Sequence, residues 1–425
     1  MKMDYHKNVL ANGLRVVSYR MPQRESFSLG IFIKVGGRYE NSQNKGMAHF
    51  LEHLLFKGSR DYSCRKIKES IEGVGGSLNG FTSEELTCYL VKMPSIYLEK
   101  ALNILSDMVI RPKLSQVEIK KERTVILEEL KMYKDLPQSY VYELLDELLW
   151  PNQPLGAPII GSVDSLLKVD RKGLLSFKNN YYNASNMIIS AAGNIDEYKL
   201  DKMVSRIFSS LPKRKDNVFI KARHGQDKTR IKVFHKDTEQ THMALGFRGF
   251  RRGHPLRHAV GLLHVILGAN MSSRLFNEVR EKRGLAYEIG TAVKRFYDTG
   301  AFLVHAGIDN RKVPDAVSLI LKELVKVKES LVKVGEFNRA KEFYIGQLRL
   351  GLEDTMEHML WIGETTATLE KIYSLDNIIN EVNRVNREDI LKCARFLFKD
   401  NNLNLSLIGP LKGAEDKIRK GLNLS

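Results

Sequence analysis

Two histidines and a glutamate within five consecutive residues form the sharpest chemical signal in the sequence, His49-Phe50-Leu51-Glu52-His53. Residues four apart share one face of a helix, so both imidazoles can point at one metal ion. The spacing is the reverse of H-E-x-x-H, in which two histidines hold zinc and the glutamate acts on its water. Burying these groups on an apolar helix would be costly without a partner. The string therefore predicts a zinc site rather than two packed core histidines.

A further ligand is expected, because a catalytic zinc ion usually takes three protein groups. In the segment 122–129, the helical stripe 122, 125, 126 and 129 reads Glu, Val, Ile, Glu. Glu122 and Glu129 would lie about 10.5 Å apart along the axis, too far to bind one ion together. One would bind the metal and the other would accept a ligand's imidazole N–H. Spacing alone leaves open which does which, while Glu128 points about 100° away and is expected to be solvated.

A second pair with the same spacing, His254 and His258, does not predict a second metal site. Arg257 stands where the glutamate should be, and a cation beside the pair opposes metal binding. The later helical segment of this half offers Glu342 and Gln347 instead of a good third ligand. We therefore expect one site per chain.

The strands and helices that must position these residues can be predicted from apolar periodicity, and their order in the first half of the chain is repeated in the second half. Expected strands lie at 9–19 (interrupted at 12–13), 26–35, 77–81, 86–93 and 187–192, then at 231–234, 243–247, 285–293, 301–306 and 403–408; expected helices lie at 44–56, 65–74, 96–109 and 117–149, then at 256–267, 274–283 and over much of 312–397.

Two local matches support a duplication. Glu69–Thr82 resembles Asn277–Gly290 at an offset of 290 − 82 = 208, and Ala191–Gly193 resembles Leu407–Gly409 at an offset of 409 − 193 = 216. A polar, basic stretch without periodicity separates the halves and predicts a linker. We expect an α+β fold of two homologous domains, each a mainly antiparallel sheet covered by helices: 1–212 with the zinc site, a linker 213–228, and 229–425.

Composition excludes several other classes of protein. A hydrophobic fraction of 43% in 425 residues argues against disorder. The net charge of +17 is spread along the chain without regularly spaced aromatic residues, which disfavours nucleic-acid binding. The sequence has neither an apolar run long enough for a membrane span nor a signal-peptide pattern. Cys64, Cys88 and Cys393 are too few and too scattered for a disulfide scaffold. A reducing, cytoplasmic setting is expected.

The motif and the downstream Glu-x6-Glu together resemble the pitrilysin/insulinase family of zinc peptidases, the inverzincins, which includes mitochondrial processing peptidase. The family's third ligand is the later glutamate, about 75 residues beyond the motif; Glu129 lies 129 − 53 = 76 residues beyond His53. The resemblance therefore implies one Zn²⁺ per chain held by His49, His53 and Glu129. It also implies support from Glu122 and a general-base role for Glu52.

The resemblance runs essentially end to end and implies further site residues. Arg280 and Tyr287 match the arginine and tyrosine that complete the family's site from the other domain, although spacing alone would make them a solvated helix residue and a core aromatic. Gly80 departs from the pattern, since many relatives carry alanine there, and the departure would loosen the strand. The strand that relatives offer to the substrate backbone corresponds to Ser77, Leu78, Asn79, Gly80 and Phe81.

By this resemblance the chain would be a zinc-dependent endopeptidase that hydrolyses extended peptides or unfolded protein segments. The alternative is a non-catalytic subunit of a related heterodimeric processing peptidase, which the complete set of catalytic residues disfavours. Larger relatives enclose substrate between four homologous domains and this chain supplies two. A homodimer is therefore expected, with a heterodimer containing a related subunit as the second possibility.

Overall fold

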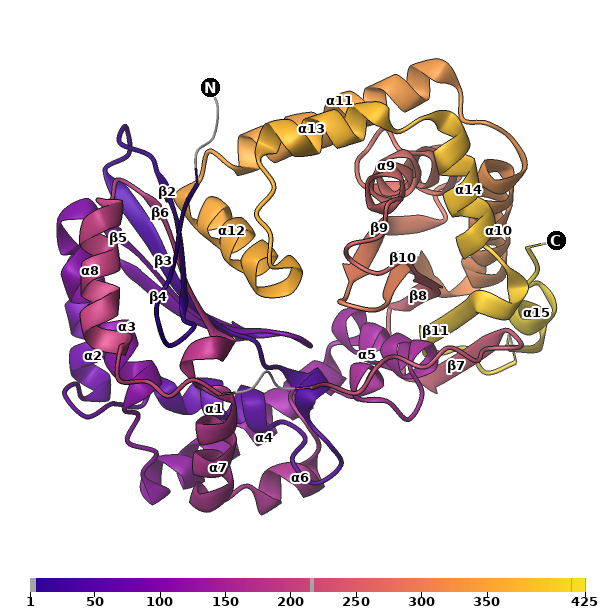
Figure 1. Cartoon of the computed structure of the whole chain (residues 1–425). Helices are drawn as coiled ribbons and strands as arrows, with labels where there is room; N and C mark the ends of the chain where they lie inside the picture. Colours follow the sequence, from indigo (N-terminus) through magenta and orange to yellow (C-terminus); the bar gives the residue numbers. More distant parts are fainter. Residues whose placement is uncertain (1–4, 215–217, 414, 425) are drawn as a thin grey trace. The chain divides into compact units, whose positions relative to one another are not determined.

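The computed structural model describes residues 5–214, 218–413 and 415–424. They divide into two units, each with its own sheet (Figure 1). The first unit comprises residues 1–131, 158–220 and 349–375, and the second comprises 132–157, 221–348 and 376–425. Each unit therefore contains a segment from the opposite half of the chain.

The sheet of the first unit has six strands in the order β1-β2-β6-β3-β5-β4. Neighbouring strands are antiparallel except β2 and β6, which are parallel. The strand β4 is therefore at an edge. The bounds are β1 His6–Val9, β2 Arg15–Arg20, β3 Ser26–Ile33, β4 Ser77–Thr82, β5 Thr87–Pro94 and β6 Met187–Gly193.

Helices cover both faces of this sheet, because successive strand residues point to opposite sides. Val16 and Ile189 belong to the core under α1, α3 and α8, whereas Val17 and Ile188 face α12 (Figure 1). The helices of the first half are α1 Met47–Leu55, α2 Cys64–Glu72, α3 Leu98–Ile110, α4 Gln116–Asp135, α5 Pro137–Leu149, α6 Val163–Lys168, α7 Arg171–Tyr181 and α8 Glu197–Phe208.

The helix α12 (Thr355–Leu369) comes from the second half of the chain and packs closely on this sheet. A Cβ atom at Gly30 would lie 2.6 Å from the sulfur of Met359, so a larger residue there would require the Met359 side chain to move. The Ser190 hydroxyl donates to the Met359 carbonyl at 2.7 Å. The contact is thus both apolar and hydrogen-bonded.

In the described residues, the sheet of the second unit repeats the strand order of the first sheet but has no counterpart of β1. Its order is β7-β11-β8-β10-β9, with one parallel pair, β7 and β11. These strands correspond in turn to β2, β6, β3, β5 and β4 of the first sheet. The bounds are β7 Arg230–His235, β8 Gln240–Gly249, β9 Ala286–Arg295, β10 Gly300–Asp309 and β11 Leu403–Gly409.

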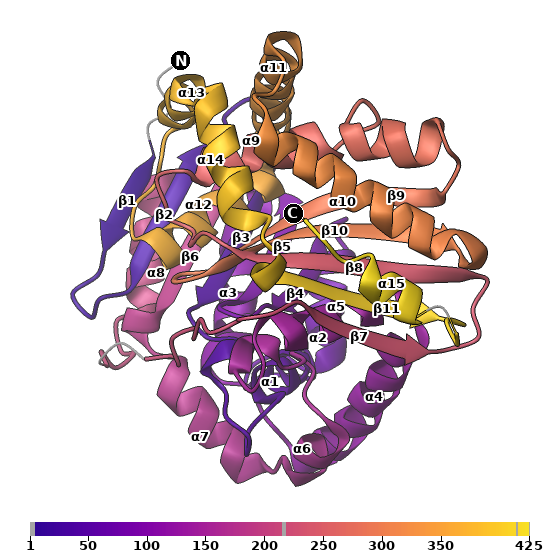
Figure 2. The same cartoon turned by 90° about the vertical axis from the view of Figure 1, so that its right-hand side faces the viewer.

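The second sheet is also covered on both faces, with α5 on one side and α9, α10 and α14 on the other (Figure 2). The helix α5 is the segment received from the first half of the chain, and its Leu145 packs where a side chain at Gly246 would stand. The helices of the second half are α9 Arg257–Gly268, α10 Val313–Glu329, α11 Val334–Gly351, α12, α13 Leu375–Arg384, α14 Arg387–Leu397 and α15 Glu415–Lys420.

The structure confirms the expected α+β fold of two homologous sheet-plus-helix units. It differs at 117–149, where the single predicted helix is two, α4 and α5, separated at Leu136. Pro137 cannot donate a backbone hydrogen bond and restricts the residue before it, so a new helix starts there. The predicted helix 274–283 is a π-helix at Phe276–Glu281. Within the described residues, no helix combines the length and apolar character needed to cross a membrane.

Candidate metal centre

Gly46 and the buried carboxylate of Glu40 determine where the helix α1 begins. Gly46 has a φ of 84°, which favours glycine, and a Cβ there would lie 2.5 Å from the Ile160 carbonyl oxygen. The Glu40 carboxylate accepts hydrogen bonds from the backbone N–H groups of Gly46 and Ala48, both at 2.7 Å. A carboxylate at this end also interacts favourably with the helix dipole. The register of the histidines on α1 is therefore well defined.

His49, His53 and Glu129 converge on one point in the first unit. The two imidazole rings have centroids 4.6 Å apart. The Glu129 carboxylate lies 3.8 Å from His49 Nε2 and 3.5 Å from His53 Nε2. One nitrogen or oxygen from each of the three lies within 4.8 Å of the others, a spacing that suits ligands of one metal ion.

Glu122 contacts the opposite edge of the His53 ring. Its carboxylate accepts a hydrogen bond from His53 Nδ1 at 2.9 Å, and its other oxygen lies 2.7 Å from Lys57 Nζ. This bond leaves Nε2 of His53 facing Glu129, and a carboxylate on the second nitrogen is the usual partner of a metal-binding histidine. The two carboxylates of the stripe on α4 therefore meet opposite ends of one imidazole.

Glu52 is buried next to the histidines and is oriented by the neighbouring strand. The Thr82 hydroxyl, at the end of β4, donates to Glu52 Oε2 at 2.7 Å. Among the described residues, the other Glu52 oxygen accepts no hydrogen bond, and no lysine or arginine forms an ion pair with this carboxylate. The arrangement leaves a carboxylate that can accept a proton.

The local environment separates the protonation behaviour of these groups. Burial, and then the nearby His53, lower the pKa of His49 to about 3. Burial raises the pKa of Glu52, opposed by the Thr82 hydrogen bond. Burial acts to lower the pKa of His53, but the hydrogen bond to Glu122 and the surrounding carboxylates raise it overall. His49 is therefore neutral at pH 7, with a lone pair available to a metal ion.

The donor atoms fit a zinc ion on chemical grounds. Two imidazoles and one carboxylate are a known ligand set for hydrolytic zinc. Within the described part of the chain, Oε2 of Glu129 and Nδ1 of His49 are buried and have no hydrogen-bond partner. Buried polar atoms normally have partners, so the cluster is incomplete without a further group. A cation held between Nε2 of the two histidines and Glu129 would give the Glu129 oxygen a partner.

The expected substrate strand coincides with β4, at the edge of the first sheet. No other strand of the described residues pairs with its outer side. Ser83 N–H donates to the Leu86 carbonyl at 2.7 Å, so alternate residues beginning with Thr82 direct their backbone groups away from β5. Gly80 agrees with this pattern, because its N–H is bonded to Oδ1 of Asn79 at 2.8 Å.

The glycine at position 80 has a steric cause in this structure. A Cβ atom there would lie 2.9 Å from Cζ of Phe56 and 3.2 Å from the Cys88 carbonyl oxygen. The Phe56 ring, just beyond the end of α1, thus occupies the space that an alanine methyl group would need. Glycine in place of the family's alanine at position 80 therefore goes together with a phenylalanine at position 56, whose ring fills the space.

Arg280 and Tyr287 belong to the second unit, whereas the metal-type cluster belongs to the first. The Arg280 guanidinium carbon lies 4.7 Å from the centroid of the Phe276 ring and 5.6 Å from that of Tyr287. The Tyr287 side chain is 75% exposed and is not a core aromatic. The two side chains are therefore neighbours, and the Tyr287 ring is accessible to solvent.

The second histidine pair has no metal-type arrangement. His258 Nε2 is 2.9 Å from Glu381 Oε2, and the Arg257 guanidinium pairs with the same carboxylate. Among the residues that the structure describes, the group containing His49 is the one set of three close ligand-type side chains.

Two contributors to the centre, Lys57 and Thr82, were not expected from the sequence. Lys57 follows His53 by four residues, so the spacing of the two histidines continues to it and could have suggested its side. Thr82 is the last residue of a strand whose neighbours had been expected to bind substrate. Nothing in the local sequence indicates that its hydroxyl reaches Glu52, because that contact depends on how α1 packs against β4.

Comparisons with known proteins give a consistent picture. The family model for Insulinase (Peptidase family M16) matches residues 15–163, and that for the Peptidase M16 inactive domain matches residues 168–344. A protein of Bacillus subtilis named as an uncharacterized zinc protease, YmxG, is 36% identical over 400 residues, 94% of this chain and 97% of its own length. An uncharacterized zinc protease of Rickettsia felis is 34% identical over 411 residues, 96% of this chain and 98% of its own.

Solved structures share the fold. A protease from Helicobacter pylori matches with a TM-score of 0.88 at 24% identity, covering 96% of this chain and all (100%) of its own. The two family matches together cover most of the chain up to residue 344, and the sequence relatives match 94% or more of it. The chain therefore belongs to peptidase family M16, the insulinase family.

Proposed function

We propose that this chain is a zinc-dependent endopeptidase that cleaves extended peptides or unfolded protein segments. The observation that carries the proposal is the convergence of His49, His53 and Glu129 within 4.8 Å, with a buried oxygen of Glu129 that has no hydrogen-bond partner among the described residues. These three side chains would hold one Zn²⁺ per chain. The names of the zinc protease relatives support the choice of metal.

The roles of the surrounding residues follow from their contacts. A bound zinc ion would supply Lewis acidity, lowering the pKa of water and polarising a peptide carbonyl. Glu52 would take the proton of the attacking water and return it to the leaving amine. Thr82 holds that carboxylate in place at 2.7 Å. Glu122 fixes the ring of His53, with Lys57 holding Glu122 in turn.

The edge strand β4 is the proposed binding site for the substrate backbone. Leu78, Gly80 and Thr82 direct their peptide groups to the open edge, so an extended chain could add there as a further strand. Main-chain hydrogen bonds would dominate this interaction, which favours loose selectivity for side chains. It also requires a substrate that is not folded.

Arg280 and Tyr287 are proposed to assist catalysis, on the family resemblance and the exposure of the Tyr287 ring. The proposed assembly is a homodimer, or a heterodimer with a related subunit, because relatives of four domains have twice the domains of this chain. The proposed setting is reducing and cytoplasmic, as expected from the few, scattered cysteines of the sequence.

The test uses a mixed peptide library, wild-type protein and the variant Glu52→Gln, with zinc content measured on both. The glutamine is close in shape and keeps an acceptor for Thr82, so the variant should bind zinc and lose cleavage. A second matched variant, Glu128→Gln, changes an exposed carboxylate on α4 that pairs with Lys131. It should retain both zinc and activity. Equal cleavage by wild type and Glu52→Gln would remove Glu52 from the mechanism.

The alternative, a non-catalytic subunit, predicts a different result. It would show no cleavage in zinc-loaded wild-type protein alone, with activity appearing after addition of a related catalytic subunit. The buried Glu52 beside the ligand cluster accepts one hydrogen bond from Thr82 and has no ion pair with a lysine or arginine among the described residues. This disfavours the alternative, because a buried carboxylate is costly to retain without a use.

A further inference from the structure

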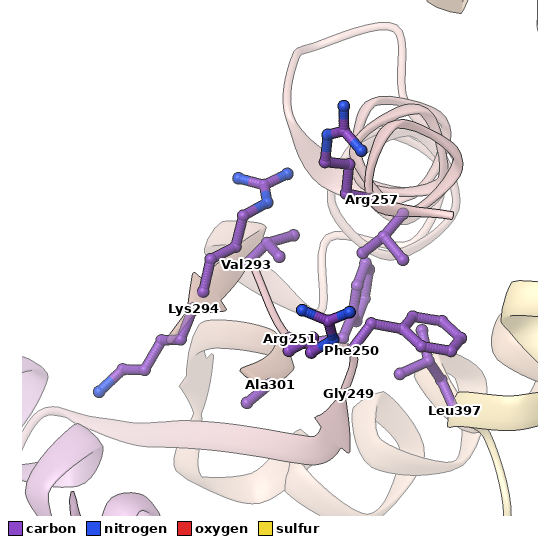
Figure 3. A pocket seen from close by; sticks show the side chains of 11 residues that line it. Gly249, Phe250, Arg251, Arg257, Val293, Lys294, Ala301 and Leu397 are labelled. Carbon is purple, nitrogen blue, oxygen red and sulfur yellow. The ribbon is translucent and has the colours of Figure 1, made fainter. Parts of the chain in front are cut away.

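Arg38 is the most deeply buried charged side chain among the residues that the structure describes, with an exposure of 0%. It lies in the short 3₁₀ helix Gly37–Tyr39, between β3 and α1. Charged side chains are mostly exposed. Around a small pocket of the second unit, for example, Arg251, Arg257 and Lys294 extend in different directions and none of them is buried (Figure 3). A guanidinium group without exposure must therefore be held by specific partners.

The partners of the Arg38 guanidinium come from two segments that are far apart in the sequence. Nη1 donates to Oε1 of Glu85, in the β4–β5 connection (residues 83–86), at 2.6 Å. Nη2 donates to the backbone carbonyl of Ile220, in the linker, at 3.3 Å. The Phe219 ring covers the group, with its centroid 3.9 Å from the guanidinium carbon. Arg38 therefore joins the β4–β5 connection to the first part of the linker, and all of these residues belong to the first unit.

The backbone beside Arg38 holds the β4–β5 connection as well. The N–H groups of Gly37 and Arg38 donate to the carbonyls of Ser83 and Glu84, at 3.2 and 2.8 Å. Gly36 lies so close to the connection that a Cβ atom there would collide with the Ser83 carbonyl oxygen. Rotation of a side chain cannot relieve a collision with backbone. The β4–β5 connection therefore has one well-defined position relative to these three residues.

The segment 36–40 is bonded to both partners of the hydrogen bond that orients Glu52. Thr82, whose hydroxyl donates to Glu52, immediately precedes the β4–β5 connection. Glu40, two residues after Arg38, accepts hydrogen bonds from backbone N–H groups at the start of α1, the helix that carries Glu52. One short segment thus holds the end of β4 on one side and the start of α1 on the other.

A contribution to stability alone does not account for a buried arginine at this place. An apolar side chain of similar size would fill the space without burying a charge, and replacement of a buried ion pair by apolar residues is often neutral or stabilising. A guanidinium group differs from an apolar group in its directional donors and planar shape. The contacts of Arg38 use both, since two of its nitrogens donate and its plane lies against the Phe219 ring.

We propose that Arg38 is a positioning residue, which holds the β4–β5 connection so that the Thr82 hydroxyl stays on Glu52. The Phe219 ring and the Ile220 carbonyl keep the guanidinium in place, so the first part of the linker supports the same hydrogen bond. The inference rests on the proposed function, in which Glu52 accepts the proton of the attacking water. It adds to that function two residues, Arg38 and Phe219, that touch neither the metal-type cluster nor the proposed substrate strand.

The first test is a double-mutant cycle, measured as kcat and KM of the zinc-loaded full chain on a peptide from the library experiment. Arg38→Gln should lower kcat about tenfold, because it loosens the charge-assisted bond that orients Glu52. KM should change little, since Leu78 and Gly80 precede the connection. In the Thr82→Val background the same substitution should lower kcat less than about twofold, because the bond through which it acts is already absent.

Further variants separate positioning from a general loss of structure. Arg38→Lys keeps a charge for Glu85 but not the planar group under the Phe219 ring, and it should recover part of the kcat that Arg38→Gln loses. Phe219→Leu removes the ring from a partly exposed position, so it is expected to fold, and it should lower kcat in the same direction. Should Arg38→Gln fail to fold, Phe219→Leu takes its place in the cycle.

The matched control is Arg111→Gln. Arg111 belongs to the same unit, and its guanidinium pairs with Asp107 at 2.6 Å and Asp61 at 2.9 Å. The control therefore removes an arginine with carboxylate partners without touching the β4–β5 connection. It should leave kcat and KM at the wild-type values.

A second measurement, hydrogen exchange followed by mass spectrometry, does not depend on activity. The backbone amides of Gly37 and Arg38 donate to the β4–β5 connection, and that of Ser83 donates within it. Exchange in peptides covering 34–40 and 82–87 should be faster in Arg38→Gln and Phe219→Leu than in wild type. It should be unchanged in Arg111→Gln.

The two measurements distinguish a failure of this inference from a failure of the proposed function. No cleavage by zinc-loaded wild type would refute the proposed function, and exchange alone would then decide whether Arg38 holds the connection. Cleavage by wild type with equal losses of kcat in both backgrounds of the cycle would overturn the positioning role. Unchanged exchange in Arg38→Gln and Phe219→Leu would overturn it as well.

Discussion

Replacing Thr82 by valine tests whether Glu52 acts as the proton acceptor. Valine keeps the branched shape of threonine but removes the hydroxyl that donates to Glu52 Oε2 at 2.7 Å. Burial raises the pKa of Glu52, and this hydrogen bond is the first influence that opposes the rise. Without it, the ionised form loses a stabilising contact, so the pKa of Glu52 should rise further.

The magnitude follows from the energy of such a bond. A hydrogen bond to a charged group contributes about 1.5–3 kcal/mol, and about 1.4 kcal/mol corresponds to one pH unit. Since water can replace part of the contact, we expect a shift of about one pH unit. Glu52 can accept a proton only when it is ionised. Activity is therefore lost as the pH falls through its pKa, and the acidic limb of the rate profile should move to higher pH.

The assay is the pH dependence of kcat/KM for a quenched fluorescent peptide taken from the library experiment, with zinc content measured at each pH. Thr82→Ser is the control, because serine keeps the hydroxyl and loses only the methyl group. Its acidic limb should stay at the wild-type position. An unmoved limb in Thr82→Val, or the same displacement in both variants, would refute the assigned role of this hydrogen bond.

Three further predictions concern the ligand cluster and the edge strand. Glu129→Gln should lower zinc content and activity together, whereas Glu128→Gln should change neither, as measured by metal analysis; zinc retained in Glu129→Gln would exclude that carboxylate as a ligand. Lys57→Met should weaken zinc binding about tenfold by releasing the carboxylate that the lysine anchors, as measured by competition with a chelator, and unchanged affinity would make the contact merely structural. Gly80→Ala should destabilise the protein by about 1 kcal/mol through overpacking, seen as a lower Tm. Combination with Phe56→Leu should restore the Tm, and a failure to do so would place the strain elsewhere.

The sequence predicts the type and order of most elements, because each strand and helix has its own apolar period. It does not predict which sheet a helix covers, because that is decided by contacts between distant residues. The predicted helix 117–149 shows the difference. Its apolar pattern is continuous, yet Pro137 ends one helix and starts another, and the second packs on Gly246 of the other half. No local pattern carries that information.

The ligand cluster shows a similar limit. The spacing of His49 and His53 places both rings on one side of a helix, and the structure has them there. The choice between Glu122 and Glu129 could not be made from spacing, because both lie on one stripe of α4. The structure brings them to opposite nitrogens of the His53 ring, where the width of an imidazole separates them. That placement depends on how α4 packs against α1, which sequence periodicity does not describe.

The exchange of α5 and α12 has a consequence for biosynthesis. The first sheet lacks a cover over one apolar face until Leu369 has left the ribosome, although its last strand is finished at Gly193. During the synthesis of the residues between Gly193 and Leu369, this apolar face of the first sheet is therefore exposed to solvent. Chaperone dependence, and the failure of either half to accumulate when expressed alone, should follow from this order of synthesis.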